Sequence, residues 1–172
     1  MPTPALRMWG RFEHTLDDKG RVIVPTKFRE KLGPECVITT GPNHHIRIYP
    51  QQVWNDLEDI LLSDDAYGEM NSDLAFLQRM FGNSETAMVD QSFRLTLPRY
   101  LREWAEVLEG DMAVIIGNNN RLEIWNRQNW KEICSSFTEV RVDETMIRRK
   151  SNVPPPTTSV QLTTNEGGSA QE

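Results

Sequence analysis

The segment DDKGRVIVPTKFRE at residues 17–30 returns as DQSFRLTLPRYLRE at residues 90–103. The copies lie 73 residues apart and share five of 14 aligned residues, in the order Asp, Arg, Pro, Arg and Glu. Unrelated segments of this length would share about one residue, and most of the remaining positions exchange one apolar side chain for another. The chain therefore contains one structural unit twice.

A second block repeats in the same order. Residues 41–49 read GPNHHIRIY and are followed by Trp54, whereas residues 117–125 read GNNNRLEIW and are followed by Trp130. The offset is now 76 residues, which predicts three inserted residues between the blocks. Each copy is too small for a core of its own, so we expect a pseudo-symmetric domain whose halves bury their apolar faces on each other.

Each copy begins with the patterns of two strands and a turn. In the first copy, Phe12, His14 and Leu16 alternate with polar residues, which is the period of a half-buried strand. Residues 18–20 are turn formers, and the β-branched residues 22–24 predict a second strand.

A short helix and a hairpin are expected next. Pro25 fits the first turn of a helix, where its missing N–H needs no partner, and Phe28 and Leu32 share one helical face. Apolar runs on both sides of turn-forming residues then predict hairpins over residues 37–49 and 113–125. The fold class predicted is β-rich α+β, built from two strand-helix-hairpin repeats.

Three further apolar patterns have helical spacing. Amphipathic helices are predicted after the hairpins, with apolar faces formed by Val53, Trp54, Leu57, Ile60 and Leu61 in one copy and by Trp130, Ile133 and Phe137 in the other. A connecting helix ending at Gly82-Asn83 would carry Met70, Leu74, Leu77, Met80 and Phe81. We interpret the tryptophans as packing anchors: Trp9, Trp54, Trp104, Trp125 and Trp130.

These patterns divide the chain into four parts. The expected boundaries are a first repeat at 8–62, a helical connector at 63–84, a second repeat at 85–140 and a C-terminal segment at 141–172. From about residue 151 the segment has neither periodicity nor bulky side chains, which predicts a disordered tail.

The charge is unevenly distributed. The formal net charge of the 172 residues is −6, which by itself argues against nucleic acid. Residues 1–32 nevertheless carry a net charge of +3, whereas residues 33–90 carry −8 and residues 91–172 carry −1. A basic face around the first repeat is therefore compatible with an acidic total.

Several other classes of protein are disfavoured. The longest apolar runs are too short for a membrane span, and the N-terminus lacks the apolar stretch of a secretory signal, so a cytoplasmic protein is expected. Cys36 and Cys134 are isolated and are interpreted as buried or semi-buried thiols. His44 and His45 lack a third ligand nearby and are read as plain turn residues. No cofactor, metal site or catalytic residue is predicted, so the chain is not expected to be an enzyme.

Asp17 and Arg21 carry the strongest functional signal. A carboxylate and a guanidinium four residues apart across a glycine-containing turn can pair and fix that turn. Two interpretations are open: the pair only fixes the turn, or the turn also presents Arg21 and Lys19 to DNA.

The motif Asp-x-x-x-Arg, then an apolar triplet, proline and a basic helix start, occurs at Asp17/Arg21 and again at Asp90/Arg94. This doubled arrangement around a connecting helix resembles the MraZ family of bacterial transcriptional regulators over about residues 8–140. The segment GRFEHTLDDKGR at residues 10–21 is also similar to the start of that family.

The resemblance implies a fold and a function. The implied fold is a double-split, swapped-hairpin β-barrel of the AbrB-like type, with both halves in one chain, assembling into a homo-oligomeric ring of many subunits. The implied function is nucleoid-associated: binding of double-stranded DNA at short direct repeats upstream of the division and cell-wall gene cluster, and regulation of transcription there.

The candidate DNA-binding residues are Lys19, Arg21, Arg11, Arg7, Lys27, Arg29 and Arg94. In the second copy Ser92 and Phe93 replace Lys19 and Gly20, which removes a cation and adds a bulky apolar group. We therefore expect the first repeat to dominate DNA contact, and Asp90 and Arg94 to be structural or to lie between subunits.

An antitoxin-like or structural oligomer acting through a protein partner is the alternative function. Such a protein would carry a long partner-wrapping segment with apolar anchors. Residues 151–172 offer only Val153, Val160 and Leu162 as anchors, which disfavours tight wrapping.

Overall fold

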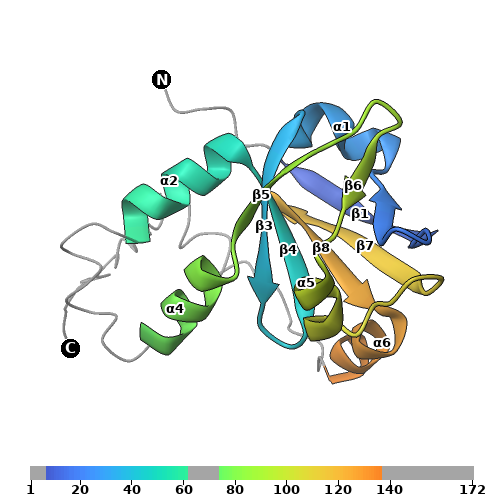
Figure 1. Ribbon diagram of the computed structural model, residues 1–172. Helices are drawn as coiled ribbons and strands as arrows, with labels where there is room; N and C mark the ends of the chain where they lie inside the picture. The colour runs from blue at the N-terminus through green and yellow to red at the C-terminus, as the bar shows by residue number, and fades with distance from the viewer. Residues whose placement is uncertain (1–6, 62–73, 137–172) are drawn as a thin grey trace, which may run out of the picture. The chain divides into compact units, whose positions relative to one another are not determined.

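The computed structural model describes residues 7–61 and 74–136. The first repeat contains β1 (Met8–Thr15), β2 (Arg21–Ile23), α1 (Thr26–Leu32), β3 (Glu35–Gly41), β4 (His45–Pro50) and α2 (Gln51–Leu61) (Figure 1). Then follow α4 (Leu74–Gly82), β5 (Glu85–Met88), β6 (Arg94–Thr96), α5 (Arg99–Trp104), β7 (Met112–Asn119), β8 (Arg121–Asn126) and α6 (Arg127–Ser136). None of the described helices is long and apolar enough to cross a membrane.

The strands of the two repeats pair with each other. The six-stranded sheet has the order β1-β7-β8-β4-β3-β5, and β2 and β6 form a separate two-stranded sheet. Every pairing outside the two hairpins, namely β1–β7, β2–β6, β4–β8 and β3–β5, joins a strand of the first repeat to a strand of the second. The fold is therefore β-rich α+β, and neither repeat forms a sheet of its own.

The sheet registers reveal a pseudo-two-fold relation. In the central pair β4–β8, Arg47 lies opposite Glu123, which is the residue 76 positions later. In the small sheet, Val22 lies opposite Leu95, which is the residue 73 positions later. Each of these offsets is the offset of the corresponding sequence block. The predicted pseudo-symmetric arrangement is thus confirmed at the level of strand pairing.

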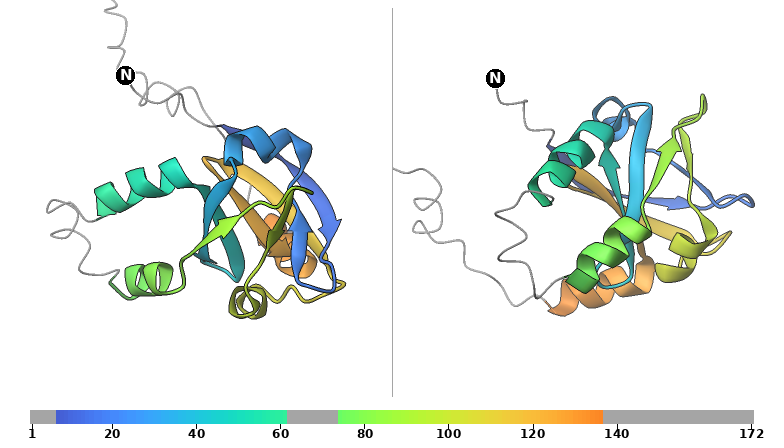
Figure 2. Two further views of the ribbon diagram at one scale, coloured as in Figure 1. Left: turned by 45° about the horizontal axis from the view of Figure 1, so that its top comes forward. Right: turned by 60° about the vertical axis from the view of Figure 1, so that its left-hand side comes forward.

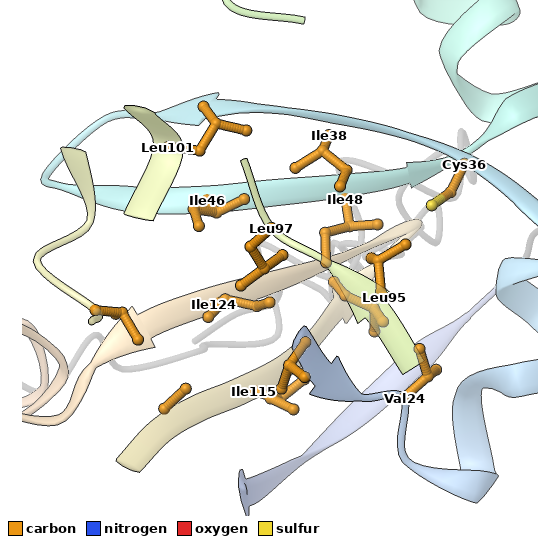
Figure 3. Close-up of a cluster of buried hydrophobic side chains, with 14 of the residues drawn as sticks. Val24, Cys36, Ile38, Ile46, Ile48, Leu95, Leu97, Leu101, Ile115 and Ile124 are labelled. Atoms are coloured by element: carbon orange, nitrogen blue, oxygen red, sulfur yellow. The ribbon is translucent and has the colours of Figure 1, made fainter. Parts of the chain in front are cut away.

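One core is shared by both repeats. Phe28 on α1 and its counterpart Leu101 on α5 are buried in the same cluster, together with Leu32. Figure 3 shows side chains of both repeats meeting there, including Ile38, Ile46, Ile48, Leu95, Leu97, Ile115 and Ile124. Each fully buried Leu, Ile or Phe side chain contributes about 1.5–3 kcal/mol to folding. Because the contributions come from both halves, the halves depend on each other for stability.

A second apolar cluster lies on the opposite face of β3 and β4. The helices α2 and α4 both cover this face (Figures 1 and 2), where Trp54 packs against Tyr49 and Phe81. The Thr39 hydroxyl donates a hydrogen bond to the Met80 carbonyl at 2.6 Å and so fixes α4 to β3. The predicted connecting helix is confirmed over α4, whereas Met70 lies outside the described residues.

The sequence alignment of the hairpins is wrong by one residue. Gly41 and His45 close the first hairpin around three residues, and Asn118 and Arg121 close the second around two. Gly41 therefore corresponds to Asn118 rather than to Gly117. Glycine and asparagine both suit turns, so the residue types could not fix this register.

Four predictions of burial are wrong. The side chain of Trp9 is 58% exposed because it points to the opposite side of β1 from the buried Met8, and Ile60 is 63% exposed near the end of α2. Cys134 is exposed on α6, whereas Cys36 is buried as expected, and burial raises the pKa of the Cys36 thiol to about 12. His45 is not a turn residue but the buried first residue of β4. Phe137 and the predicted tail lie outside the described residues.

Candidate nucleic-acid interface

The first Asp-x-x-x-Arg motif forms a closed turn between β1 and β2. Asp17 Oδ1 accepts hydrogen bonds from the backbone amides of Lys19 and Arg21, both at 2.9 Å, and Asp17 Oδ2 accepts one from Arg21 Nε at 2.6 Å. The Gly20 amide donates to the Asp17 carbonyl at 3.0 Å, and Gly20 adopts a φ of +68°. A positive φ favours glycine, so the motif and the glycine together define this turn.

The second motif forms the same turn between β5 and β6. Asp90 Oδ1 accepts from the amides of Ser92 and Arg94, both at 2.8 Å, and Asp90 Oδ2 accepts from Arg94 Nε at 2.9 Å. Phe93 takes the place of Gly20 with a φ of +58°. A bulky residue rarely adopts this conformation, so the turn is strongly determined by its surroundings.

These hydrogen bonds favour the charged form of both carboxylates. Partial burial raises the pKa of Asp17, but the bonds from Arg21 and Lys19 outweigh it and hold that pKa below its ordinary value. The Arg94 amide is the main cause of the lowered pKa of Asp90. A charged carboxylate binds the arginine in a fixed orientation, so each turn is preorganised.

The two turns present different chemistry to the solvent. Lys19 is exposed. The side chain of Arg21 is 22% exposed, and its bond to Asp17 uses only Nε. The second turn offers Arg94, whose side chain is 34% exposed, beside Ser92 and the half-exposed Phe93. Because β2 and β6 are antiparallel, the two turns lie at opposite ends of this short strand pair.

The other predicted cations form a separate group. Arg7 lies just before β1, and its carbonyl accepts a hydrogen bond from Lys31 Nζ at 2.5 Å. Lys27 extends from α1 toward Gly10 of the same strand. The first turn follows the far end of β1, about 25 Å away at 3.3 Å per residue. The predicted basic face is therefore divided between the two ends of β1.

Two predicted cations are engaged within the chain. Arg11, on β1 between the two groups, pairs with Glu13. Arg29 donates from Nε to the Val24 carbonyl at 2.9 Å, and its guanidinium lies 4.0 Å from the centre of the Phe93 ring. Arg29 therefore stacks on the second turn as a cation–π partner and is not a freely extended surface charge.

Sequence reasoning missed Arg102, which takes the position of Arg29 in the second repeat. Arg102 donates from Nε to the Leu97 carbonyl at 2.9 Å and forms an ion pair with Glu109. It is buried, and it lies against Gly20 of the first turn. The signal was present in the sequence, because Arg29 and Arg102 are one of the five identical pairs of the repeat.

The chain is similar to known proteins over most of its length. A family model described as "MraZ protein, putative antitoxin-like" matches residues 8–68 and 80–150. A curated "Transcriptional regulator MraZ" from Moorella thermoacetica is 38% identical over 135 residues, covering 76% of this chain and 88% of that protein. Proteins of the same description from Roseiflexus castenholzii and Pediococcus pentosaceus are 38% and 35% identical, covering 74% and 76% of this chain and 87% and 88% of their own lengths.

Proposed function

The chain belongs to the MraZ family of transcriptional regulators, and from that premise we propose that it binds specific DNA through the turn at residues 17–21. One observation carries the proposal. The two turns have the same internal hydrogen bonds, yet only the first combines an exposed lysine, a glycine and a preorganised arginine. Lys19 would contact phosphate, and Arg21 would contact phosphate or the edge of a guanine.

The second turn has a structural role in this proposal. Phe93 takes the place of Gly20, and Arg29 is held against its ring. Asp90 and Arg94 would fix this turn, either within the chain or against another subunit. Arg7, Lys27 and Lys31 lie too far from the first turn to share its contacts and would add phosphate contacts elsewhere along a duplex.

The exchange of strands between the repeats supports a more specific assignment of the fold. We assign the chain to the swapped-hairpin, AbrB-like β-barrels, with repeats at 8–62 and 85–140, a connector at 63–84 and a C-terminal segment at 141–172. The supporting feature is that β1 pairs with the hairpin of the second repeat and β5 pairs with the hairpin of the first.

Assembly would supply the affinity that one small turn lacks. A single turn makes few phosphate contacts and therefore binds DNA weakly. In a ring of subunits, several first turns would meet short direct repeats at a fixed spacing, and each later contact would be effectively intramolecular. Such avidity raises affinity by a factor of about 10² to 10⁴. The proposed target is the DNA upstream of the division and cell-wall gene cluster, which implies a cytoplasmic, nucleoid-associated protein.

The proposal is tested by fluorescence anisotropy with the duplex upstream of the coding region and a scrambled duplex, at two salt concentrations. The wild-type protein should prefer the upstream duplex and lose affinity as the salt concentration rises. Arg21→Ala should abolish the preference, whereas the matched variant Arg94→Ala should retain it. Size-exclusion chromatography of each variant establishes that assembly is intact.

Equal binding of both duplexes by the wild-type protein would contradict the proposal. The same holds if an assembled Arg21→Ala variant keeps the preference. Either result would favour the antitoxin-like or structural role, in which a protein partner takes the place of DNA.

A further inference from the structure

The guanidinium of Arg102 lies directly against the backbone of Gly20. A Cβ atom placed on Gly20 would come within 2.6 Å of both Cζ and Nε of Arg102. Only a residue without a side chain permits this approach. The contact joins the repeats, because Gly20 belongs to the first turn and Arg102 to the helix α5 of the second repeat.

Hydrogen bonds continue this contact into the turn. Arg102 Nε donates to the Leu97 carbonyl at 2.9 Å, and the Leu97 amide donates to the Gly20 carbonyl at 3.0 Å. Gly20 in turn donates to the Asp17 carbonyl, and Asp17 holds Arg21. An unbroken series of contacts therefore runs from Arg102 to the arginine proposed to touch DNA.

The charge of Arg102 is balanced by a loop that the first repeat lacks. Seven residues join α5 to β7, whereas two join α1 to β3. The longer loop carries Glu109, which pairs with Arg102, and the lowered pKa of Glu109 is due to its backbone hydrogen bond and to Arg102. The loop also binds the strand before the turn, since the Gly110 amide donates to the Leu16 carbonyl at 3.0 Å.

The second turn is built differently at the equivalent positions. Arg29 makes the same bond to the carbonyl before its proline, but it stacks on the Phe93 ring instead of a glycine backbone. Beside it an open cavity of about 300 Å³ is bordered by Val24, Gly33, Pro34, Val89 and Phe93. The first turn is therefore supported by a buried arginine that pairs with the exposed Glu109, and the second by a half-exposed aromatic ring.

We propose that Arg102 is a positioning residue for DNA recognition, which holds the first turn through Gly20 and so sets the orientation of Lys19 and Arg21. This inference rests on the proposed function. A planar guanidinium can bond Leu97 and Glu109 while its face lies on Gly20, which a lysine ammonium cannot do. Glycine at position 20 thus serves both the turn conformation and the contact with Arg102.

The test compares Arg102→Met with Arg29→Met in the full chain. At a temperature where circular dichroism shows both variants to be folded, Arg102→Met should bind the upstream duplex about tenfold more weakly, the factor of one lost base contact. Binding of the scrambled duplex should change less, and Arg102→Lys should not restore the preference. Arg29→Met should bind like the wild type. A purely structural Arg102 would lower the melting temperature and leave the preference unchanged.

A second pair of variants applies if Arg102→Met does not fold. Gly20→Ala and Gly33→Ala both place a side chain at positive φ, but only the first meets Arg102, because nothing lies within 4 Å of a Cβ on Gly33. We expect Gly20→Ala alone to lose the preference. Suppose that the wild-type protein prefers the upstream duplex and Arg21→Ala does not. This inference is then overturned if folded Arg102→Met, or Gly20→Ala, keeps the preference of the wild type. The absence of any preference in the wild type overturns the proposed function instead.

Discussion

His45 stacks on Trp125 across the central strand pair, with the ring centres 4.1 Å apart and the ring planes 16° apart. His45 Nε2 accepts a hydrogen bond from Arg47 at 3.2 Å, and Glu123 Oε1 lies 3.8 Å from the same nitrogen. Burial lowers the pKa of His45 to about 4, although Glu123 acts in the opposite direction. In the folded chain this imidazole is therefore neutral near pH 7.

Acidification should destabilise the fold through His45. The folded pKa of about 4 lies below the ordinary value of 6.5, so between these pH values the unfolded chain takes up a proton that the folded chain excludes. The free energy of unfolding is almost unaffected above pH 6.5 and falls as the pH decreases, and the loss reaches about 3 kcal/mol at pH 4. The measurement is urea unfolding of the wild type and of His45→Phe from pH 7 to pH 4.5. The effect of His45 is the difference between the two slopes of unfolding free energy against pH.

The neighbouring histidine supplies the control for this measurement. His44 has an exposed side chain stacked on Trp104, so His44→Phe should keep the pH dependence of the wild type. Parallel curves for the wild type and His45→Phe would contradict the assignment of this pH dependence to His45.

Glu123 should be far more important for stability than a surface carboxylate. It is buried, and it accepts hydrogen bonds from Asn118, Arg121 and Trp125. Removing one partner from a buried ionic network costs about 3–5 kcal/mol, because the remaining groups lose their compensation. We expect Glu123→Ala to lower the free energy of unfolding by about 3 kcal/mol, the low end of that range, since Arg121 is partly exposed.

Chemical denaturation at pH 7 checks this value against Glu13→Ala. Glu13 forms an exposed pair with Arg11, and such pairs contribute about 0–1 kcal/mol. Equal losses in the two variants would show that the Glu123 cluster has no special stabilising role.

Gly117 should be required for the close approach of β1 and α1 to β7. A Cβ atom there would lie 2.8 Å from the backbone carbon of Met8 and 2.8 Å from the Phe28 ring. The backbone atom cannot move aside cheaply, so Gly117→Ala should destabilise the chain by about 1–3 kcal/mol, as overpacking does. Gly82→Ala is the matched control, because nothing lies within 4 Å of its Cβ. Similar melting temperatures for the two variants would be inconsistent with this packing.

Much of the secondary structure follows from local residue patterns. The alternation before Asp17, the β-branched run ending at Pro25 and the shared face of Phe28 and Leu32 each correspond to an observed strand or helix. These patterns depend on neighbours a few residues apart, so one sequence suffices to find them. The doubled Asp-x-x-x-Arg motif likewise predicted two fixed turns, and both form the expected pairs.

The remaining features depend on contacts between distant segments. The residue type of Trp9 does not reveal which face of β1 is exposed, and that of His45 does not reveal a stack on Trp125. The sequence assigned no role to Arg102, because its contact, Gly20, is 82 residues away in the chain. For such residues the sequence repeat identifies the equivalent position in the other half. The role of the side chain becomes visible only in the packing of one half on the other.

The shared core predicts that a cavity in either repeat weakens both. Phe28 and Leu101 occupy equivalent helices and are completely buried in one cluster. Truncating a buried Phe or Leu to alanine costs about 2–5 kcal/mol. Phe28→Ala and Leu101→Ala should each lower the stability by this amount while the chain still unfolds in one transition. Tryptophan fluorescence and circular dichroism should give coincident curves, because neither repeat retains a core once the other has unfolded. Two separate transitions in either variant would mean that each repeat is stable on its own.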